Sequence, residues 1–199
     1  MLVQRDSLEM MVFELLRTPR YSIATYDVKF GSSMMLGEIR GGERLQQVLP
    51  YVASYRGVAL HLEQSFQHGI GAFLQWGVED YLQELFSQDE RYRPLLLRAK
   101  EKNIEVFAVE YPERELQVVA ERAEEMQAFV EKRMRTPGSY PEIAAEVFGE
   151  MKNFPELLAI RRIRQIPERF RSSLIVECPA IIVPWVLSGL SIERDAEGF

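Results

Sequence analysis

Cysteine and histidine are scarce in this chain of 199 residues, which contains one cysteine and two histidines. The lone thiol, Cys178, excludes a disulfide within the chain and gives no support for a thiolate metal cluster. His61 and His68 are too few for most zinc sites. A metal site in this protein would therefore depend on carboxylates.

Long apolar runs and an excess of positive charge are also missing. No segment approaches the roughly 18 consecutive apolar residues of a transmembrane helix. The N-terminal segment places charges among its apolar residues, which is unlike a signal peptide. The net charge of −6 does not provide the basic surface that phosphate binding needs. The sequence therefore predicts a cytoplasmic protein with no nucleic-acid partner and no membrane partner.

The composition is that of an ordinary globular protein, with 47% hydrophobic and 27% charged residues. A chain of this length can bury a proper core. It contains no repeat, no low-complexity tract and no linker that would divide it. We therefore expect one α/β domain over residues 1–199.

Apolar periodicity predicts the elements of that domain. The predicted strands cover residues 21–30, 33–37, 57–63, 104–109, 173–178 and 190–193, and the first two form a hairpin. The predicted helices cover residues 8–16, 43–54, 78–86, 93–102, 113–135, 141–151, 155–170 and 181–189. Gly69 and Gly71 are expected in a loop, and the amphipathic helix at 113–135 is expected as an insertion or crossover. The alternation of elements predicts a mainly parallel sheet with helices on both faces.

Glutamates stand at the ends of four of the apolar runs. Glu38, Glu63, Glu110 and Glu177 each close or follow a predicted strand. In an open α/β sheet the ligand site lies beyond the carboxyl ends of the strands. Four carboxylates at that place predict a divalent cation, an acid/base pair or a basic partner. Glu38 and Glu63 are the best pair for a catalytic base, and all four glutamates are candidate metal ligands.

Arginines near the same end are candidates for binding negative charge. Arg40 lies in a glycine-flanked loop and could bind a substrate carboxylate or phosphate, or could neutralise Glu38 or Glu63. Arg161 and Arg162 lie on a predicted helix, and one of the two is expected to face the crevice.

Histidine, cysteine and tyrosine give weaker signals. His68 is the histidine we consider for proton transfer, whereas His61 is expected to be a hydrogen-bonded core residue. No neighbouring base for Cys178 is visible, so we expect a buried structural thiol. Tyr111 is expected to pack beside Pro112.

Several segments together resemble the group of TraB/Tiki, ChaN and erythromycin-esterase-like proteins. Leu36-Gly37-Glu38 resembles the opening strand of that group, and Leu60-His61-Leu62-Glu63 resembles its second strand. Residues 92–111 resemble the following helix and strand. Arg161-Arg162 falls where the group often has an Arg-Asn or Arg-Asp pair, and residues 174–192 resemble its final strand, loop and helix. The resemblance implies an α/β fold and a hydrolase-type activity.

The chain departs from that group at its histidines. Ile39 or Arg40 stands where the first histidine is expected, and Glu177-Cys178-Pro179 replaces the final "GxGH". Relatives are thought to use these histidines for acid/base work or metal binding.

Two hypotheses follow. The first is a divergent hydrolase that acts on an ester or amide in a small molecule or peptide, with or without a divalent metal. In this hypothesis Glu38 or Glu63 is the base and His68 assists. Arg40 and either Arg161 or Arg162 stabilise the developing negative charge. The second is an inactive member that binds a ligand or a protein partner, or forms an oligomer.

Overall fold

The computed structural model describes residues 5–17, 26–30, 33–37, 48–152, 158–171 and 173–188. The strands are β1 (Tyr26–Phe30), β2 (Ser33–Gly37), β3 (Gly57–Leu60), β4 (Glu105–Ala108) and β5 (Leu174–Cys178). The helices are α1 (Arg5–Arg17), η1 (Leu49–Ser54), α3 (Phe66–Trp76), η2 (Asp80–Leu82), α4 (Gln83–Gln88), α5 (Tyr92–Glu101), α6 (Glu113–Met134), α7 (Tyr140–Lys152), α8 (Leu158–Gln165), α9 (Glu168–Arg171) and η3 (Ala180–Ile182). Residues 183–188 are also helical. The protein has an α/β fold.

The five strands form one sheet in the order β1-β2-β5-β3-β4. β1 and β2 are an antiparallel hairpin, and the β2–β5, β5–β3 and β3–β4 pairs are parallel. The predicted hairpin and the mainly parallel sheet are therefore confirmed. Because β2, β3, β4 and β5 run in the same direction, their carboxyl ends meet at one end of the sheet.

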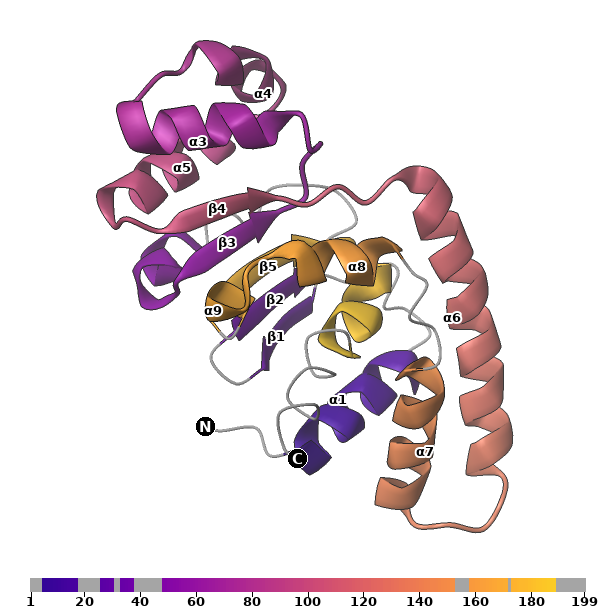
Figure 1. Cartoon of the computed structure of the whole chain (residues 1–199). Helices are drawn as coiled ribbons and strands as arrows, with labels where there is room; N and C mark the ends of the chain where they lie inside the picture. Colours follow the sequence, from indigo (N-terminus) through magenta and orange to yellow (C-terminus); the bar gives the residue numbers. More distant parts are fainter. Residues whose placement is uncertain are drawn as a thin grey trace.

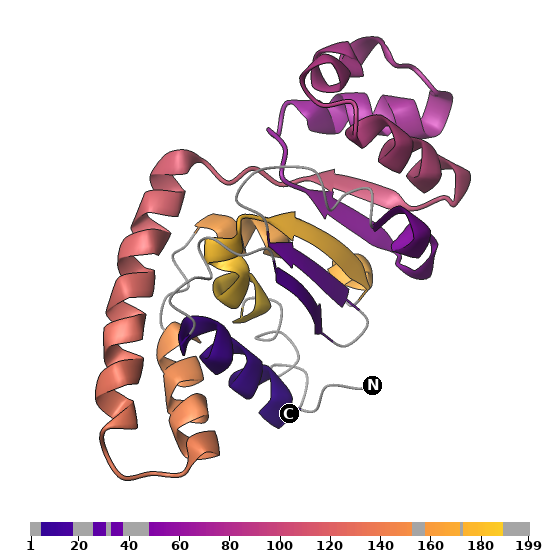
Figure 2. The same cartoon turned by 180° about the vertical axis from the view of Figure 1, so that it is seen from behind.

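Two clusters of buried side chains share this sheet. One joins α1, α6 and α7 to β5 through residues such as Leu174 and Val176. The other joins α3 and α5 to β3 and β4, and it includes Ile175 of β5. Successive residues of a strand point to opposite faces, so β5 contributes to both clusters. Figure 1 shows α3 and α5 beside β4 and β3, with α1, α6 and α7 grouped apart from them; Figure 2 shows the same arrangement from behind.

The central strands are apolar because they are buried. Every residue of β3 and β5 is buried, which is typical of strands covered by other elements. Ile175 of β5 pairs with Met34 of β2 and with Val58 of β3. The buried residues of β5 include Glu177, which lies at the carboxyl end of the sheet.

Helix ends follow the predicted signals. Asn103 has φ 54°, in the left-handed region that ends helices. Its N–H donates to Lys100 O at 3.2 Å, and Ile104 N–H donates to Ala99 O at 2.8 Å, so α5 closes directly before β4. The prediction for Asn103 is confirmed. The long helix is also confirmed, since α6 buries its apolar stripe of Val119, Ala123, Met126 and Val130.

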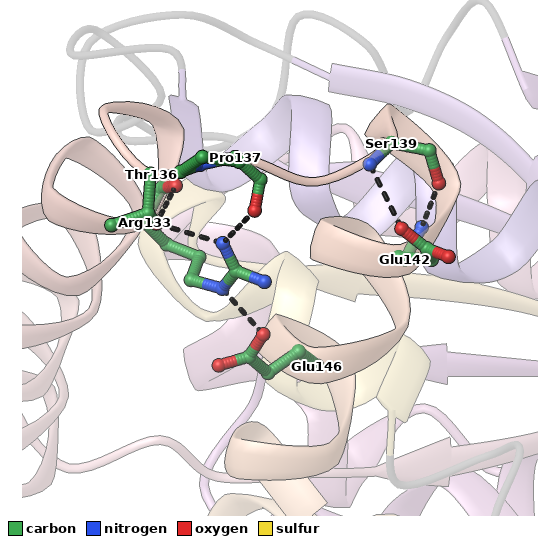
Figure 3. A network of polar contacts seen from close by, with 6 residues as sticks. All are labelled: Arg133, Thr136, Pro137, Ser139, Glu142 and Glu146. Atoms are coloured by element: carbon green, nitrogen blue, oxygen red, sulfur yellow. Dashed lines mark hydrogen bonds and ion pairs between the residues drawn. The ribbon is translucent and has the colours of Figure 1, made fainter.

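The turn between α6 and α7 is held by side chains (Figure 3). Arg133 Nε donates to Glu146 Oε2 at 2.6 Å, and Arg133 Nη1 donates to Thr136 Oγ1 at 2.7 Å. Ser139 N–H donates to Glu142 Oε2 at 2.9 Å, and Glu142 N–H donates to Ser139 Oγ at 3.4 Å. This reciprocal pair is a capping box that starts α7, so the α6–α7 hairpin has a defined geometry.

The loop predicted around Gly69 and Gly71 is wrong, because both glycines lie within α3. A Cβ on Gly69 would stand 2.9 Å from Tyr81 Cβ, whereas a Cβ on Gly71 would meet nothing within 4 Å. Gln67 fixes the start of the helix against β4: its side chain donates to Val106 O at 3.1 Å and accepts from Ala108 N–H at 2.6 Å.

Two predicted boundaries are also wrong. β3 ends at Leu60 rather than at residue 63, because Leu62 N–H donates back to Leu60 O at 2.9 Å and turns the chain. The predicted helix at 155–170 is interrupted by Pro167, which separates α8 from α9 and disfavours helical backbone at Ile166.

Several predictions fall outside the described residues: residues 21–25 of the first strand, residues 43–47 of the helix at 43–54, and the closing strand at 190–193. The rest of the helix at 43–54 is described and is mostly the 3-10 helix η1. Among the residues that the structure describes, no helix is both long and apolar enough to cross a membrane.

Candidate functional site

Glu177 is the second-to-last residue of β5, and it is 5% exposed. Its Oε2 accepts a hydrogen bond from His61 N–H at 2.9 Å and one from Tyr92 Oη at 3.4 Å. His61 follows β3, and Tyr92 begins α5. The carboxylate is therefore fixed between three elements at the carboxyl end of the sheet.

The local backbone explains this arrangement. The turn at Leu62 takes His61 out of the β3 ladder. The N–H of His61 then needs another acceptor, since a buried backbone donor left unpaired is costly. Glu177 supplies that acceptor across 116 positions of sequence.

The His61 side chain is half-buried beside Tyr111, with ring centroids 5.1 Å apart in an edge-on arrangement. Burial lowers the pKa of His61 below its ordinary value, and a hydrogen bond with the Tyr111 backbone and the charge of Glu110 oppose that effect. The imidazole is therefore neutral at neutral pH. His61 was expected to be a hydrogen-bonded core residue inside a strand. It lies just after β3 instead, with a half-buried side chain, and its backbone N–H is the group bonded to Glu177.

This pKa shift makes stability depend on pH. Because the folded pKa lies below the unfolded value of about 6.5, the unfolded chain binds more protons as the pH falls, and folding loses stability. Urea unfolding at pH values from about 7.5 down to about 5 should show this loss, and His61→Gln should reduce its slope. His68→Gln removes an exposed histidine and is the matched control. Equal slopes for wild type and His61→Gln would contradict this account.

Three further groups near Glu177 stay protonated. Burial, with the charge of Glu177, raises the pKa of Tyr92, of Cys178 and of Tyr111 above the ordinary range. A thiol of this kind is a poor nucleophile, so the structure supports the structural interpretation of Cys178. The two tyrosines remain hydrogen-bond donors.

The Tyr111 hydroxyl is the exceptional group of this cluster. Tyr111 is 3% exposed, and within the part of the chain that the structure describes its Oη has no hydrogen-bond partner. Burial is the main cause of its raised pKa; Cys178 and Glu177 raise it further, and the charge of Arg162 opposes them. A buried hydroxyl without a partner is uncommon and needs an explanation. The predicted packing of Tyr111 beside Pro112 does not explain why its hydroxyl is buried without a partner.

Arg162, rather than Arg161, faces this cluster. Arg162 Nη1 donates to Glu110 O, and Nη2 lies 3.1 Å from Glu115 Oε1 on α6. Arg161 is exposed. The guanidinium of Arg162 therefore holds the segment after β4 against the start of α6.

The structure does not bring the other predicted residues into this cluster. Glu63 is exposed and accepts from Ser65 Oγ at 3.3 Å. His68 is exposed on α3, with its ring 5.5 Å from that of Tyr81. Glu38 and Arg40 lie outside the described residues. The pairing of Glu38 with Glu63 therefore stays a prediction.

The predicted metal ligands Glu63, Glu110 and Glu177 do not assemble with one another. No group of three or more histidine, cysteine, aspartate or glutamate side chains within the described ranges could hold a metal ion. Because Glu38 lies outside the described residues, the metal site formed by all four glutamates stays a prediction.

Two pockets lie away from the carboxyl end of the sheet. One of about 320 Å³ lies between α1 and α6, where Leu16, Val130 and Met134 line it. The other, of about 480 Å³, lies between α3 and α5, where Gly71 and Lys100 line it. None of their lining residues belongs to the cluster around Glu177.

Sequence reasoning missed Tyr92 and Tyr111 as members of the cluster. A signal was present for both, because Tyr92 opens a helix and Tyr111 follows a strand-ending glutamate. Whether their hydroxyls turn toward β5 depends on packing between distant segments, which a local pattern does not encode.

No protein-family model matches this chain, and neither a curated protein nor a solved structure matches it significantly. The resemblance to the TraB/Tiki, ChaN and erythromycin-esterase-like group therefore stays a prediction.

Proposed function

We propose that the protein is a divergent TraB/ChaN/erythromycin-esterase-like hydrolase, with its site at the carboxyl end of the sheet and Glu177 as the central carboxylate. The substrate class is an ester or amide in a small molecule or peptide. One observation carries the proposal: a buried glutamate at the end of the central strand is fixed by His61 and Tyr92, with the unpartnered Tyr111 hydroxyl beside it.

The proposal treats the chain as one domain with helices on both faces of its sheet. The contribution of β5 to two separate buried clusters supports this arrangement. A rigid sheet places Glu177 with little freedom, and catalytic groups need this kind of support.

In this mechanism water adds to the substrate carbonyl carbon while the Glu177 carboxylate accepts a proton from it. The Tyr111 hydroxyl donates a hydrogen bond to the carbonyl oxygen as that oxygen becomes negative. The C–O or C–N bond then breaks, and the proton held by Glu177 passes to the leaving group. The products are a carboxylic acid and an alcohol or amine.

Tyr111→Phe tests this role. Because the hydroxyl has no partner in the free protein, its removal should leave the free energy of unfolding unchanged or slightly higher. Loss of one oxyanion donor should lower kcat by roughly 10²- to 10³-fold. Hydrolysis of 4-nitrophenyl esters and anilides by wild type and variant gives the ratio. Tyr81→Phe alters an exposed tyrosine on η2 and is the control. An unchanged kcat in Tyr111→Phe would remove Tyr111 from the mechanism.

A non-catalytic binding or interaction module is the second candidate. The exposure of Glu63, which was expected to act as a base, and of His68, which was expected to assist, favours it. The same substrate panel separates the two functions, since a binding module would bind these compounds or their acid products without turnover.

A further inference from the structure

The segment after β4 brings Glu110 and Glu115 to one guanidinium, that of Arg162. Glu63, which follows β3, is exposed and lies outside this group. Arg162 already lies 3.1 Å from Glu115. In the part of the chain that the structure describes, neither Glu63 nor Glu110 forms an ion pair.

Glu110 is placed to act on a ligand. It is half-buried, so its charge is less screened than that of exposed Glu63. Its backbone carbonyl is held by Arg162, and it precedes Tyr111, whose buried hydroxyl has no partner. The two side chains are linked through His61, whose ring lies 5.1 Å from that of Tyr111 and on which the charge of Glu110 acts.

We propose that the substrate of this site carries a cationic group, an ammonium or a guanidinium, that pairs with Glu110 while the reacting carbonyl faces the Tyr111 hydroxyl. This inference rests on the proposed function for its catalytic part. Its binding part stands without turnover, because an ion pair with Glu110 needs no reaction.

Matched ligands test the cationic group. Nα-acetyl-lysine 4-nitrophenyl ester and Nα-acetyl-norleucine 4-nitrophenyl ester differ essentially in the ammonium group. Wild type should hydrolyse the lysine ester with kcat/KM about tenfold or more above the norleucine ester, since a charge-assisted hydrogen bond contributes that much. Glu110→Gln should abolish the preference for the lysine ester over the norleucine ester. Glu113→Gln, at the exposed start of α6, is the matched control.

Calorimetric titration of Nα-acetyl-lysine amide and Nα-acetyl-norleucine amide decides the inference independently of turnover. Tighter binding of the lysine compound to wild type, lost in Glu110→Gln, supports it. Equal binding of both amides, or a preference that survives in Glu110→Gln, overturns it. If neither ester is hydrolysed but the binding preference is present, the hydrolase proposal fails and the cation site stands. If both esters are hydrolysed equally, the cation inference fails and the hydrolase proposal stands.

Discussion

Replacing Glu177 by glutamine should lower kcat by roughly 10²- to 10⁴-fold, which is the usual contribution of a positioned general base. The amide keeps the size of the side chain and keeps an oxygen that can accept from His61 N–H and Tyr92 Oη. Folding should therefore be retained while proton transfer is lost. Kinetics with the 4-nitrophenyl esters, together with circular dichroism of the same samples, measures both effects.

Glu177→Leu separates the structural role of this residue from its chemical role. It removes the acceptor and leaves two donors unpaired in a buried place, which should cost about 1–3 kcal/mol for each donor. Glu113→Gln should change neither stability nor rate. A Glu177→Gln protein with wild-type kcat would remove Glu177 from the mechanism, whatever the stability of Glu177→Leu.

The second large effect concerns two glycines of α3. Gly69→Ala should lower the free energy of unfolding by about 1–3 kcal/mol, as overpacking does. The new Cβ would stand 2.9 Å from Tyr81 Cβ and 3.1 Å from Tyr81 O, and a backbone oxygen cannot rotate away. Gly71→Ala in the same helix should raise stability by up to about 1 kcal/mol, because alanine is the better helix former and its Cβ meets nothing within 4 Å.

Urea or thermal unfolding of the two variants tests this pair. For a chain of this size each kcal/mol corresponds to about 2–4 °C in Tm, so the two substitutions should shift Tm in opposite directions. Shifts of equal sign and size would show that Tyr81 does not pack over Gly69 in solution.

The same glycines show why local patterns were insufficient. Gly69 and Gly71 were predicted in a loop because glycine is unfavourable inside a helix. The structure places Gly69 where Tyr81 and Leu82 approach the helix closely, and this contact involves a segment that no local pattern includes. Periodicity over a long stretch was more reliable, as α6 shows with its four buried positions.

The sequence predicted a candidate site at the carboxyl end of the sheet, and the structure brings only some of the predicted residues together there. Ligand sites of open α/β sheets lie at the carboxyl ends of the strands. This rule pointed to Glu177 and to the segment around Glu110. It could not foresee that the chain turns at Leu62, which leaves Glu63 exposed. Nor could it choose between Arg161 and Arg162, because the rotation of α8 depends on its packing.

The central claim is that the carboxyl end of the sheet around Glu177 and Tyr111 binds the ligand. A crystal structure of Glu177→Gln with Nα-acetyl-lysine methyl ester tests it most directly. The account predicts the ester carbonyl oxygen at about 2.7–3.1 Å from the Tyr111 hydroxyl and the ammonium beside Glu110. An ester bound instead in the pocket lined by Gly71 and Lys100, with the Tyr111 hydroxyl still unpartnered, would contradict it.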